Sequence, residues 1–594
     1  MSYKFDYTKY KPELISILNE VDEEEQLTWK KFRQILGRYP KDGNKMFSKT
    51  NLVVGYKALL KEGSEYIPHD DSILAKIQMK PVRTQSGVTT VTVLTKPFPC
   101  PGKCIFCPND IRMPKSYLAD EPGAQRAERN KFDPYLQTYR RLQALRNIGH
   151  PTQKVELIIL GGTWSYYPEP YQIWFIKRCF EALNDFGDGI DNTNETEERA
   201  QNLEFKQDDF DAKKIRSESY NKVISKISRR SNMKLFDKSE TAQWDELFSE
   251  HERNVHNKCR NVGLVIETRP DNISPEEVIR IRKLGCTKTQ IGLQSLQDNV
   301  LEKNKRGHDV QASIEAIKLL RQAGLKIHAH WMANLYGSTL EQDITDYHKL
   351  FEDPAFRPDE LKIYPCSLIE TADLMDYYER GEWKPYNHDQ MLTLLTETIK
   401  ATPEYCRLTR VVREFSSDDI VDGNTTSNFR QIAEQTIDKA GDARLDIRSR
   451  EIKHEKIDPE ELSLSIITYE TLVGREKFLQ YITKSNKIVG FLRLSLPQNP
   501  NNTSPIDTHS FIPELSGAAV IREIHVYGNA VNLGKKKDGK AQHSGLGTKL
   551  IEKAKELSKE AGYKKLAVIS AIGTREYYKG RGFSTDGLYQ SLVI

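Results

Sequence analysis

The central part of the chain alternates between short apolar runs and amphipathic segments. Val155–Leu160, Leu264–Thr268 and Thr289–Leu293 are apolar runs of strand length. After them, Pro275–Leu284 and Val310–Ala323 place apolar residues at helical spacing. Strands separated by helices predict βα units, and repeated βα units predict a parallel sheet.

The same alternation starts at Val88–Leu94 and continues through Lys326–Trp331 and Glu360–Tyr364. We therefore predict an α/β fold over residues 81–405, arranged as a partial (βα) barrel. In barrels of parallel strands, the chemistry sits on loops at the carboxyl ends of the strands. The loops that follow Leu94 and Leu160 are candidates for an active site.

The pattern changes from about residue 408 onward. Lys487–Leu494, Ala518–Tyr527 and Leu566–Ser570 predict strands, and Lys549–Ala561 predicts a helix. We predict a linker over residues 406–455 and a second α/β domain over residues 456–594.

The first 80 residues are expected to be helical and basic. From Gln26 to Lys61 the only acid is Asp42, against many lysines and arginines, and Tyr39, Phe47 and Tyr56 are interleaved with these cations. Such a stretch can neutralise phosphates and stack on unpaired bases. A solvated, lysine-rich helical face is an equally good interpretation of the same pattern.

A charged segment at about residues 184–256 interrupts the alternation. It is rich in Asp, Glu, Asn, Lys and Ser and has few aromatic residues. We predict that its first half is a mobile insertion. Tyr220–Ile227 and Thr241–Phe248 are candidates for short surface helices.

Composition narrows the class of protein. The chain has 594 residues, which predicts two to four domains, and 88 Lys and Arg against 84 Asp and Glu give a net charge of +4. The sequence has no run of about 18 apolar residues, so no membrane span is predicted. The first residues lack the apolar core of a signal peptide. The eight cysteines show no disulfide framework, so we predict a cytoplasmic protein without a membrane partner.

Three of the cysteines form a compact motif directly after the run Val88–Leu94. Cys100, Cys104 and Cys107 have the spacing C-x3-C-x2-C in a loop rich in Pro and Gly. Cysteine thiolates are the usual ligands of iron–sulfur clusters. Three thiolates on a four-iron cluster leave one iron open for a substrate or cofactor. A zinc knuckle or buried structural cysteines are the alternatives, but zinc sites usually combine two separated pairs of cysteines, or cysteine with histidine, and no second pair follows nearby.

A glycine-rich turn in the second domain is a candidate phosphate-binding loop. Gln542, Gly545, Leu546, Gly547 and Thr548 form a Gln-x-x-Gly-x-Gly turn between a strand and a helix. Backbone N–H groups at a helix N-terminus hold a pyrophosphate, and glycines let the backbone approach it. A generic nucleotide loop is the alternative, although the Lys-Ser/Thr of a P-loop is missing.

Both motifs resemble those of known families. The cysteine motif is that of the radical S-adenosylmethionine (radical SAM) superfamily. The glycine turn, with the later Tyr577-Tyr578-x-x-x-Gly582-Phe583, resembles the GCN5-related N-acetyltransferase (GNAT) fold, whose ligand is coenzyme A. Together they resemble the Elp3 family, the catalytic subunits of Elongator and their stand-alone archaeal and bacterial relatives. The matching stretches are Lys80–Gly87, Pro97–Pro108, Phe132–Tyr135, Lys154–Thr163, Gly263–Asp271, Gly292–Ser295, Leu361–Pro365, Arg522–Gly528 and Gln542–Phe583.

The resemblance implies a tRNA uridine(34) acetyltransferase. Such an enzyme uses acetyl-CoA and a SAM-derived 5′-deoxyadenosyl radical to form 5-carboxymethyluridine at the wobble position. The cofactors implied are a [4Fe-4S] cluster, SAM and acetyl-CoA. The partners implied are tRNA, at its anticodon region, and a second copy of the chain or Elongator-like subunits.

The resemblance also implies roles for individual residues. Cys100, Cys104 and Cys107 would ligate the cluster, and Gly161, Gly162 and Thr163 would support the amino-acid end of SAM. Glu267, Arg269 and Gln294 would contact SAM or substrate, unless they form ordinary barrel hydrogen bonds and ion pairs. The resemblance also implies an acetyl-CoA site made of the turn Gln542–Thr548, the strand residues Glu523, Ile524, His525 and Val526, and Lys154 and Tyr578. Of these, Tyr578 and Lys154 would be catalytic. Lys154 also reads as a plain surface lysine, and Tyr578 as a packed tyrosine.

The chain departs from the family pattern in two places. The insertion at 184–256 is longer than the family leads us to expect, and no cysteine lies near Arg444, where relatives often carry one. A zinc site formed partly by His328, His330 and Cys366 is an alternative to core or substrate-lining histidines. Two rival functions stay open at this point: a lysine acetyltransferase with a structural iron–sulfur domain, and a non-catalytic tRNA-binding subunit.

Overall fold

The structure is a computed structural model. It describes residues 5–25, 27–68, 71–79, 86–200, 219–230, 235, 237–413, 415–426, 428–453, 458–497, 511–527 and 545–594. Gln542 and most of the stretch 80–87 lie outside the described residues.

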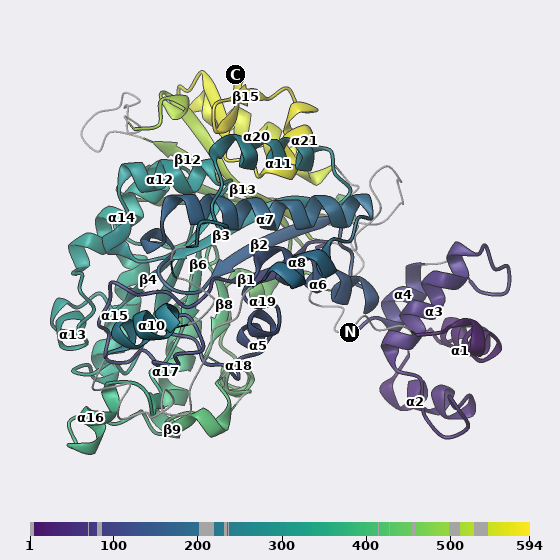
Figure 1. Cartoon of the computed structure of the whole chain (residues 1–594). Coiled ribbons are helices and arrows are strands. Elements are labelled where there is room, and N and C mark those ends of the chain that lie inside the picture. Colours follow the sequence, from purple (N-terminus) through teal and green to yellow (C-terminus); the bar gives the residue numbers. More distant parts are fainter. Residues whose placement is uncertain are drawn as a thin grey trace.

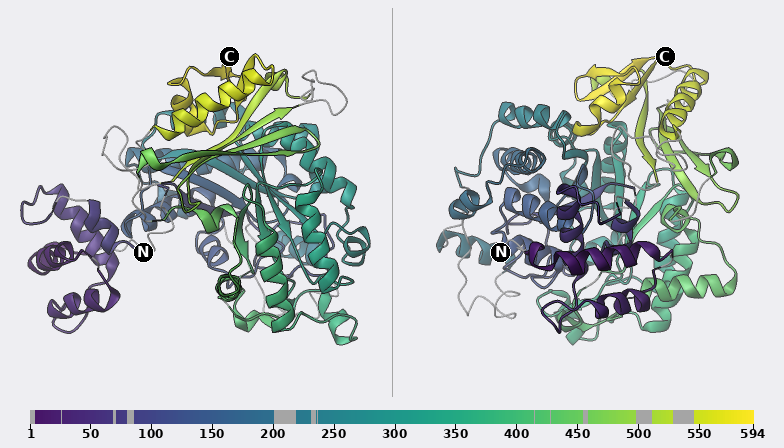
Figure 2. Two further views of the ribbon diagram at one scale, coloured as in Figure 1. Left: turned by 180° about the vertical axis from the view of Figure 1, so that it is seen from behind. Right: turned by 90° about the vertical axis from the view of Figure 1, so that its right-hand side faces the viewer.

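A separate helical unit forms the N-terminus. It consists of η1 (Thr8–Tyr10), α1 (Lys11–Glu23), α2 (Trp29–Arg38), α3 (Lys49–Lys61) and α4 (Asp71–Ile77). These helices bury their own apolar core and stand to one side of the molecule (Figures 1 and 2). Lys57 Nζ ties the unit to the barrel, since it donates a hydrogen bond to the Arg146 carbonyl at 2.7 Å.

The structure of this unit contradicts the expectation that its interleaved aromatic residues can stack on unpaired bases. Phe47 and Tyr56 are each 2% exposed, and Tyr39 is half-buried with its hydroxyl bonded to Glu20. Their apolar faces complete the small core, so Phe47 and Tyr56 are not available to stack on bases. Among the described residues of the unit, Trp29 and Tyr66 are the strongly exposed aromatics.

The central domain is a seven-stranded, all-parallel sheet in the order β1-β2-β3-β4-β5-β6-β8. This confirms the predicted partial barrel. The strands are β1 (Thr89–Leu94), β2 (Lys154–Leu160), β3 (Arg260–Thr268), β4 (Lys288–Gln294), β5 (Lys326–Trp331), β6 (Glu360–Ile363) and β8 (Arg407–Val411).

Helices wrap the outer face of this sheet (Figure 1). They are α5 (Pro122–Arg129), α6 (Pro134–Asn147), α7 (Glu169–Asp188), α8 (Thr193–Arg199), α10 (Tyr220–Arg230), α11 (Trp244–Val255), α12 (Pro275–Lys283), α13 (Asp298–Lys303), α14 (Val310–Gln322), α15 (Leu340–Glu352), α16 (Leu374–Glu379) and α17 (His388–Ala401), with η3 (Trp164–Tyr166) and η5 (Pro270–Asn272) in loops. Six of them carry capping boxes or Asn, Asp, Ser or Thr side-chain caps at their N-termini, as at Asp133, Ser274, Asp309 and Thr339.

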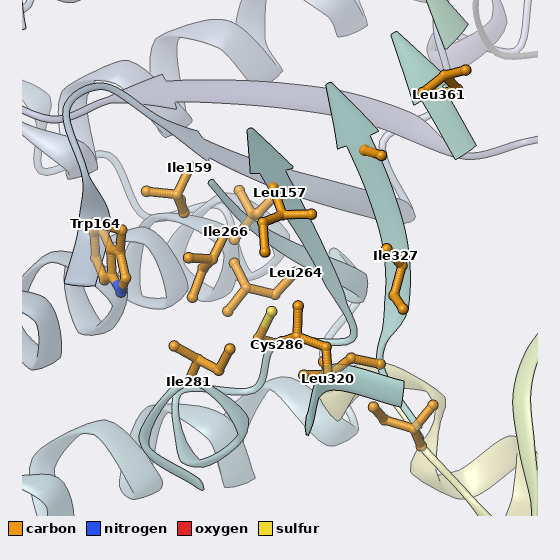
Figure 3. Close-up of a cluster of buried hydrophobic side chains, with 14 of the residues drawn as sticks. Leu157, Ile159, Trp164, Leu264, Ile266, Ile281, Cys286, Leu320, Ile327 and Leu361 are labelled. Carbon is orange, nitrogen blue, oxygen red and sulfur yellow. The ribbon is translucent and has the colours of Figure 1, made fainter. Parts of the chain in front are cut away.

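Strand alternation gives the barrel an apolar outside and a polar inside. Leu157, Ile266 and Ile327 face the helices and pack against residues such as Ile281 and Leu320 (Figure 3). Neighbouring positions face the interior, because successive side chains of a strand point to opposite faces. The polar groups of the interior include Glu156, Glu267, Lys288, His328, His330, Glu360 and Lys362.

The C-terminal domain is a second, mixed sheet in the order β10-β11-β12-β13-β14-β16-β15. Its elements are η7 (Pro459–Glu461), β10 (Ser463–Glu470), β11 (Gly474–Ile482), β12 (Ile488–Pro497), η8 (Pro513–Leu515), β13 (Ala518–Val526), α20 (Leu546–Glu560), β14 (Lys565–Val568), η10 (Ile572–Thr574), α21 (Arg575–Lys579), β15 (Ser584–Asp586) and β16 (Tyr589–Val593). β13 and β14 are parallel, and α20 covers the sheet (Figure 2).

The linker predicted over residues 406–455 is wrong. β8 pairs in parallel with β6 and completes the barrel sheet, and β9 (Ile420–Asp422) pairs with β7 (Leu368–Ile369). η6 (Ser417–Asp419), α18 (Phe429–Ala440) and α19 (Ile447–Arg450) fill the rest of the segment. β8 is short and carries Arg407 and Arg410, so its apolar pattern is too weak to mark it as a strand.

The insertion is more ordered than the sequence predicts. α7 extends to Asp188, α8 follows it, and α10 and α11 correspond to the two candidate surface helices. Both pack inward: Tyr220 is 3% exposed and joins Ile111 in a small apolar cluster. Residues 201–218 lie outside the described part. No helix of the described chain is long and apolar enough to cross a membrane.

Candidate functional site

A cavity of about 170 Å³ opens at the carboxyl ends of the barrel strands. Cys100, Cys104 and Cys107 line it together, because the loop that carries them leaves the end of β1. Gly161, Gly162 and Thr163, which follow β2, line the same cavity, as do Glu267, Arg269 and Gln294 from the ends of β3 and β4. All the residues predicted for the cluster and SAM are thus brought together. Their individual roles stay predictions.

The Cys104 sulfur lies in a positively charged environment. Arg306 Nη1 is 3.4 Å from it and Arg269 Nη1 is 3.6 Å from it. A hydrogen bond from the Cys107 thiol and these two guanidinium groups hold the pKa of Cys104 well below its usual range, against the opposing effect of burial. The thiolate is the form that binds metals, so the site favours the ligand form of Cys104.

Arg269 is itself held in place by fixed partners. Its Nε and Nη2 atoms each donate to an Asp271 carboxylate oxygen at 2.9 Å, and Nη2 also donates to the Arg306 carbonyl at 2.6 Å. Arg306 in turn donates to the Gly292 carbonyl at 2.8 Å. The two guanidinium groups therefore form one braced pair beside Cys104.

The insertion holds the backbone of Cys100. The Asn221 side chain of α10 accepts a hydrogen bond from the Cys100 N–H at 2.9 Å and donates one to the Cys100 carbonyl at 2.8 Å. Tyr220 donates a hydrogen bond to the Met113 carbonyl at 2.6 Å. Glu240 forms an ion pair with the buried Lys96 just before the loop. The insertion thus clamps the cysteine loop at several points.

The glycines after β2 are required by close packing. Gly161 has a φ of +141°, and a Cβ there would lie 1.9 Å from Thr95 Oγ1. Gly102 in the cysteine loop has the same requirement, because a Cβ would lie 2.3 Å from Arg269 Nη1. Thr163 Oγ1 is 3.7 Å from the Cys100 sulfur. The glycines let the loop, Thr95 and the arginines share a small space.

Polar groups continue below the cysteines into the barrel. Tyr117 donates a hydrogen bond to Glu267 at 3.2 Å, and His330 Nδ1 lies 3.8 Å from Glu267 Oε1. Gln294 has a left-handed backbone, with a φ of +71°, which turns the chain at the end of β4. Burial lowers the pKa of His330 well below its usual range, so its ring is neutral.

The donor set suits an iron–sulfur cluster better than a single metal ion. No group of three or more Cys, His, Asp or Glu side chains in the described chain is gathered closely enough to hold one ion. A four-iron cluster needs its thiolates on separate irons, and three cysteines around one cavity beside two arginines provide that arrangement.

The alternative zinc site is not formed. His328 Nε2 is hydrogen-bonded to Thr409 Oγ1 at 2.8 Å, and His330 Nε2 to Gln290 Oε1 at 2.9 Å. Cys366 lines the cavity, where burial raises its pKa to about 12. The structure therefore supports the interpretation of buried and cavity-lining histidines.

The acetyl-CoA residues lie in the second domain. Gly545 has a φ of +69° and precedes α20, whose first turn receives no side-chain cap. A Cβ at Gly547 would lie 2.5 Å from the Tyr577 hydroxyl oxygen. Arg581 donates to Thr548 Oγ1 at 3.2 Å. The start of α20 thus presents uncapped N–H groups beside Tyr577, a geometry suited to a pyrophosphate.

Strand β13 separates its four predicted residues onto two faces. Ile524 packs against the start of α20, whereas Glu523 forms ion pairs with Lys326 and Arg493 at the barrel. β13 pairs with β14 only over Ala518–Ile521, and the register against β12 shifts beside Glu523. The strands therefore part at the level of these residues. The Ile524 side chain faces the start of α20.

Tyr578 lies in the buried core of the second domain, and Lys154 lies at the start of β2 in the barrel. Tyr578 is 6% exposed and packs edge-on against Phe583 and Tyr577, and burial raises its pKa. Lys154 begins β2 opposite Arg260, where burial lowers its pKa. Arg260 contacts η10, since a Cβ at Gly573 would lie 2.6 Å from the Arg260 Cβ. Their roles toward acetyl-CoA stay predictions.

The two candidate sites lie at opposite ends of the barrel. The second domain contacts the beginnings of strands, through Lys326 of β5 and Arg260 of β3, and the cysteine cavity lies at their ends. A nine-residue strand such as β3 spans roughly 26 Å at about 3.3 Å per residue. The two candidate sites are therefore separated by about the length of a strand.

Buried charges fill the space between the two ends. Lys326 bridges Glu360 of the barrel, at 3.1 Å, and Glu523 of the second domain. Arg522 of β13 pairs with the fully buried Asp359. Such buried pairs fix the relative placement of the domains, because removing one partner leaves an uncompensated charge.

The fold and the cavity define a class. A parallel barrel with three cysteines at the carboxyl end of its first strand, joined to a mixed sheet with a glycine-opened helix, is a radical SAM protein with an acetyltransferase-like domain. The family model described as the Radical SAM superfamily matches residues 236–348, and the Radical_SAM C-terminal domain matches residues 358–439. Membership of this superfamily implies a [4Fe-4S] cluster and SAM.

Similarity over most of the chain specifies the family. The tRNA uridine(34) acetyltransferase of Methanocaldococcus jannaschii is 37% identical over 533 residues, 87% of this chain and 86% of that protein. Elongator complex protein 3 of Danio rerio is 33% identical over 92% of each chain. The archaeal Methanocaldococcus infernus Elp3 with an N-terminal deletion (1–46) gives a TM-score of 0.65 at 31% identity, and covers 86% of this chain and 100% of that one. The chain belongs to the Elp3 family.

Arg306 and Asn221 were missed by sequence reasoning. Arg306 lies in a loop after α13, more than 200 positions from the sulfur that it contacts. Asn221 lies inside the charged insertion and resembles any other polar residue there. Neither position carries a local pattern that points to the cysteine loop.

Proposed function

We propose that this protein is a tRNA uridine(34) acetyltransferase that forms 5-carboxymethyluridine at the wobble position, with acetyl-CoA and SAM as co-substrates. One observation carries the proposal: an intact cysteine cavity and a glycine-opened pyrophosphate site occur in one chain that is 37% identical to a protein of that name over most of its length.

The cavity supports the radical half of this reaction. Cys100, Cys104 and Cys107 would hold the cluster, which with SAM supplies the radical needed to break an unactivated C–H bond. A hydrogen bond from Cys107, together with Arg306 and Arg269, lowers the pKa of Cys104, and the two arginines are themselves braced by Asp271 and backbone carbonyls. The chain thereby places the ligands before any cofactor arrives.

Cations of the cavity support a polyanionic substrate. Lys115, Lys362 and Arg413 line the cavity, and cations attract and orient phosphates. Arg413 is partly neutralised by Glu121, which holds its guanidinium in a fixed position. This positive lining fits RNA, and the anticodon region of tRNA is its proposed part. Association with a second copy or with Elongator-like subunits stays a prediction.

The experiment that tests the function is mass spectrometry of tRNA nucleosides. Cells that lack this gene should lose 5-carboxymethyluridine and its derivatives, and complementation with the wild-type chain should restore them. An unchanged nucleoside profile would contradict the proposal. If acetylated lysines disappeared instead, the result would favour the rival function, a lysine acetyltransferase.

The N-terminal unit offers a direct test of RNA binding. Charge reversal at Lys41 and Lys45 should weaken tRNA binding and flatten its salt dependence, because each lost phosphate contact removes about one unit of slope. Lys49 is unsuitable, since its ammonium donates to the carbonyls of Lys76 and Gln78 at 3.2 and 3.3 Å. Filter binding at several salt concentrations measures both quantities.

Lys11→Gln is the matched control. The Lys11 ammonium is paired with Glu62 at 2.8 Å, so its loss should leave the salt slope unchanged. Equal affinity and slope for the double charge reversal and the wild type would show that the basic segment is only a solvated face.

A further inference from the structure

A second cavity, of about 290 Å³, lies at the seam between the barrel and the C-terminal domain. Its walls come from α11 (His251), α12 (Arg282 and Lys283), α21 (Arg575) and the turn before β16 (Leu588). α11 packs against η10, which leads directly into α21. None of these residues lines the cysteine cavity or belongs to the predicted acetyl-CoA set.

The walls of this seam cavity carry an excess of positive charge. Arg282 is 3% exposed and, among the described residues, its hydrogen bonds go to the backbone carbonyls of Cys286, Ser570 and Leu588, while its guanidinium lies 5.1 Å from the centre of the Tyr589 ring. Its Nε has no hydrogen-bond partner among the described residues. Carbonyls and a ring do not cancel a full charge, and no carboxylate in the described part of the chain forms an ion pair with this buried guanidinium.

Arg575 has still fewer partners. Within the described chain, no hydrogen bond or ion pair is formed by its guanidinium, although the side chain is half-buried. Burial lowers the pKa of both Arg282 and Arg575, and the nearby positive charge of Arg575 lowers the pKa of Arg282 further. Lys283 adds a third cation, placed 4.2 Å from the centre of the Trp244 ring.

Nearby acids do not balance these cations. Glu252 also lines the cavity, but its residue is exposed and it attracts Arg575 only at a distance. Glu514 accepts a hydrogen bond from the Leu588 N–H at 3.3 Å and lies against Gly587. Clustering desolvated like charges without a counter-ion is unfavourable. A bound anion would remove this cost.

We propose that the seam cavity binds a phosphate-class anion, either free phosphate or a small phosphomonoester. Guanidinium groups match phosphate oxygens in shape and charge. His251 is 4% exposed and its Nε2 has no partner among the described residues, so the ring offers one more polar contact. A volume of about 290 Å³ is at the lower limit of small-molecule sites, which span about 300–1,000 Å³, and it excludes coenzyme A or an RNA strand.

The site lies between the two domains, so binding there should affect the stability of the whole chain. Arg282 and Lys283 belong to the barrel, whereas Arg575 belongs to the C-terminal domain. An anion held between them would join the two domains by charge-assisted contacts. Its binding should therefore raise the melting temperature of the whole chain, because a ligand that binds only the native state stabilises it.

The test uses the full chain in phosphate-free buffer at constant ionic strength. Isothermal titration calorimetry with inorganic phosphate should show saturable binding by the wild type, and the melting temperature should rise with phosphate but not with matched chloride. Arg575→Gln should weaken binding at least about tenfold, as expected for the loss of a charged hydrogen-bond donor. Lys579→Gln is the matched control: this lysine is on the same short helix and its side chain is 70% exposed.

Without ligand, Arg575→Gln is expected to affect the melting temperature in the opposite direction. In phosphate-free buffer the variant should melt at the same or a higher temperature than the wild type, because an unpaired charge has been removed. Lys283→Ser should lower phosphate affinity more modestly and provides a second variant if Arg575→Gln does not fold. Glycerol 3-phosphate, titrated in parallel, distinguishes the sources: tighter binding than phosphate identifies a phosphomonoester.

Two results would overturn the proposal. One is the absence of saturable binding of both phosphate and glycerol 3-phosphate at millimolar concentrations. The other is an unchanged affinity in Arg575→Gln, which would place any binding elsewhere. Coenzyme A affinity should be the same in wild type and Arg575→Gln, so a failure here leaves the proposed enzymatic function untouched.

Discussion

Replacing Cys104 with serine is expected to abolish cluster assembly and SAM cleavage. The sulfur of Cys104 is the one placed beside Arg269 and Arg306, and the pKa of its thiol is held low. A serine hydroxyl does not ionise in this range, so one of three cluster ligands is lost, and thiolate ligands act as a set. Iron and sulfide analysis after anaerobic reconstitution, electron paramagnetic resonance and the yield of 5′-deoxyadenosine measure the loss.

Cys366→Ser is the matched control for this experiment. Cys366 lines the same cavity and is 3% exposed, but it lies outside the motif, and burial raises its pKa to about 12. Its replacement should leave the iron content near that of the wild type. The C-terminal domain of Cys104→Ser should still bind coenzyme A, because its sheet contacts the other end of the barrel. A Cys104→Ser protein that cleaves SAM at the wild-type rate would contradict the cluster assignment.

Tyr578→Phe is expected to lower the tRNA-stimulated release of coenzyme A by about 10²–10⁴-fold, the usual contribution of a positioned acid. Burial raises the pKa of Tyr578, so the phenol stays protonated and can donate its proton to the leaving thiolate. The ring packs against Phe583 and Tyr577, and phenylalanine keeps that packing. Cluster content and tRNA binding should therefore remain near normal. Free thiol release, measured with and without tRNA, gives the rate.

Tyr577→Phe is the natural comparison. Tyr577 lies next in the helix, is 37% exposed and places its hydroxyl at Gly547 near the start of α20. Its loss should raise the KM for acetyl-CoA and leave kcat almost unchanged. Coenzyme A release that does not depend on tRNA, and is equal in Tyr578→Phe and wild type, would refute the coupling and favour a lysine acetyltransferase.

The separation of the two sites makes tRNA dependence an informative readout. The cysteine cavity and the seam with the second domain lie at opposite ends of the barrel strands, and buried pairs such as Arg522 with Asp359 fix the domains. An enzyme that hydrolysed acetyl-CoA before RNA arrived would waste it, so we expect docking to complete the site. A change in thioester hydrolysis on tRNA addition would then report on communication across the barrel.

Several features of this protein are determined by the sequence alone. The strands and most helices follow from local periodicity, because burial of one face needs only the spacing of apolar residues. The cysteine loop is equally local: three ligands within eight positions reach one cavity wherever the chain goes. The family match rests on motifs of the same kind, and the fold class and the function agree with the relatives.

The tertiary structure alone decided which distant groups meet. Arg306 reaches Cys104 and Asn221 reaches Cys100 because loops and an inserted helix converge on one end of the barrel. Phe47 is buried and cannot stack on RNA bases, because a small helical unit needs every large apolar side chain for its core. β8 could not be predicted from the sequence, because this edge strand is rich in arginine and has no apolar run. Spacing along a chain encodes which face a residue is on, and only packing determines what lies opposite that face.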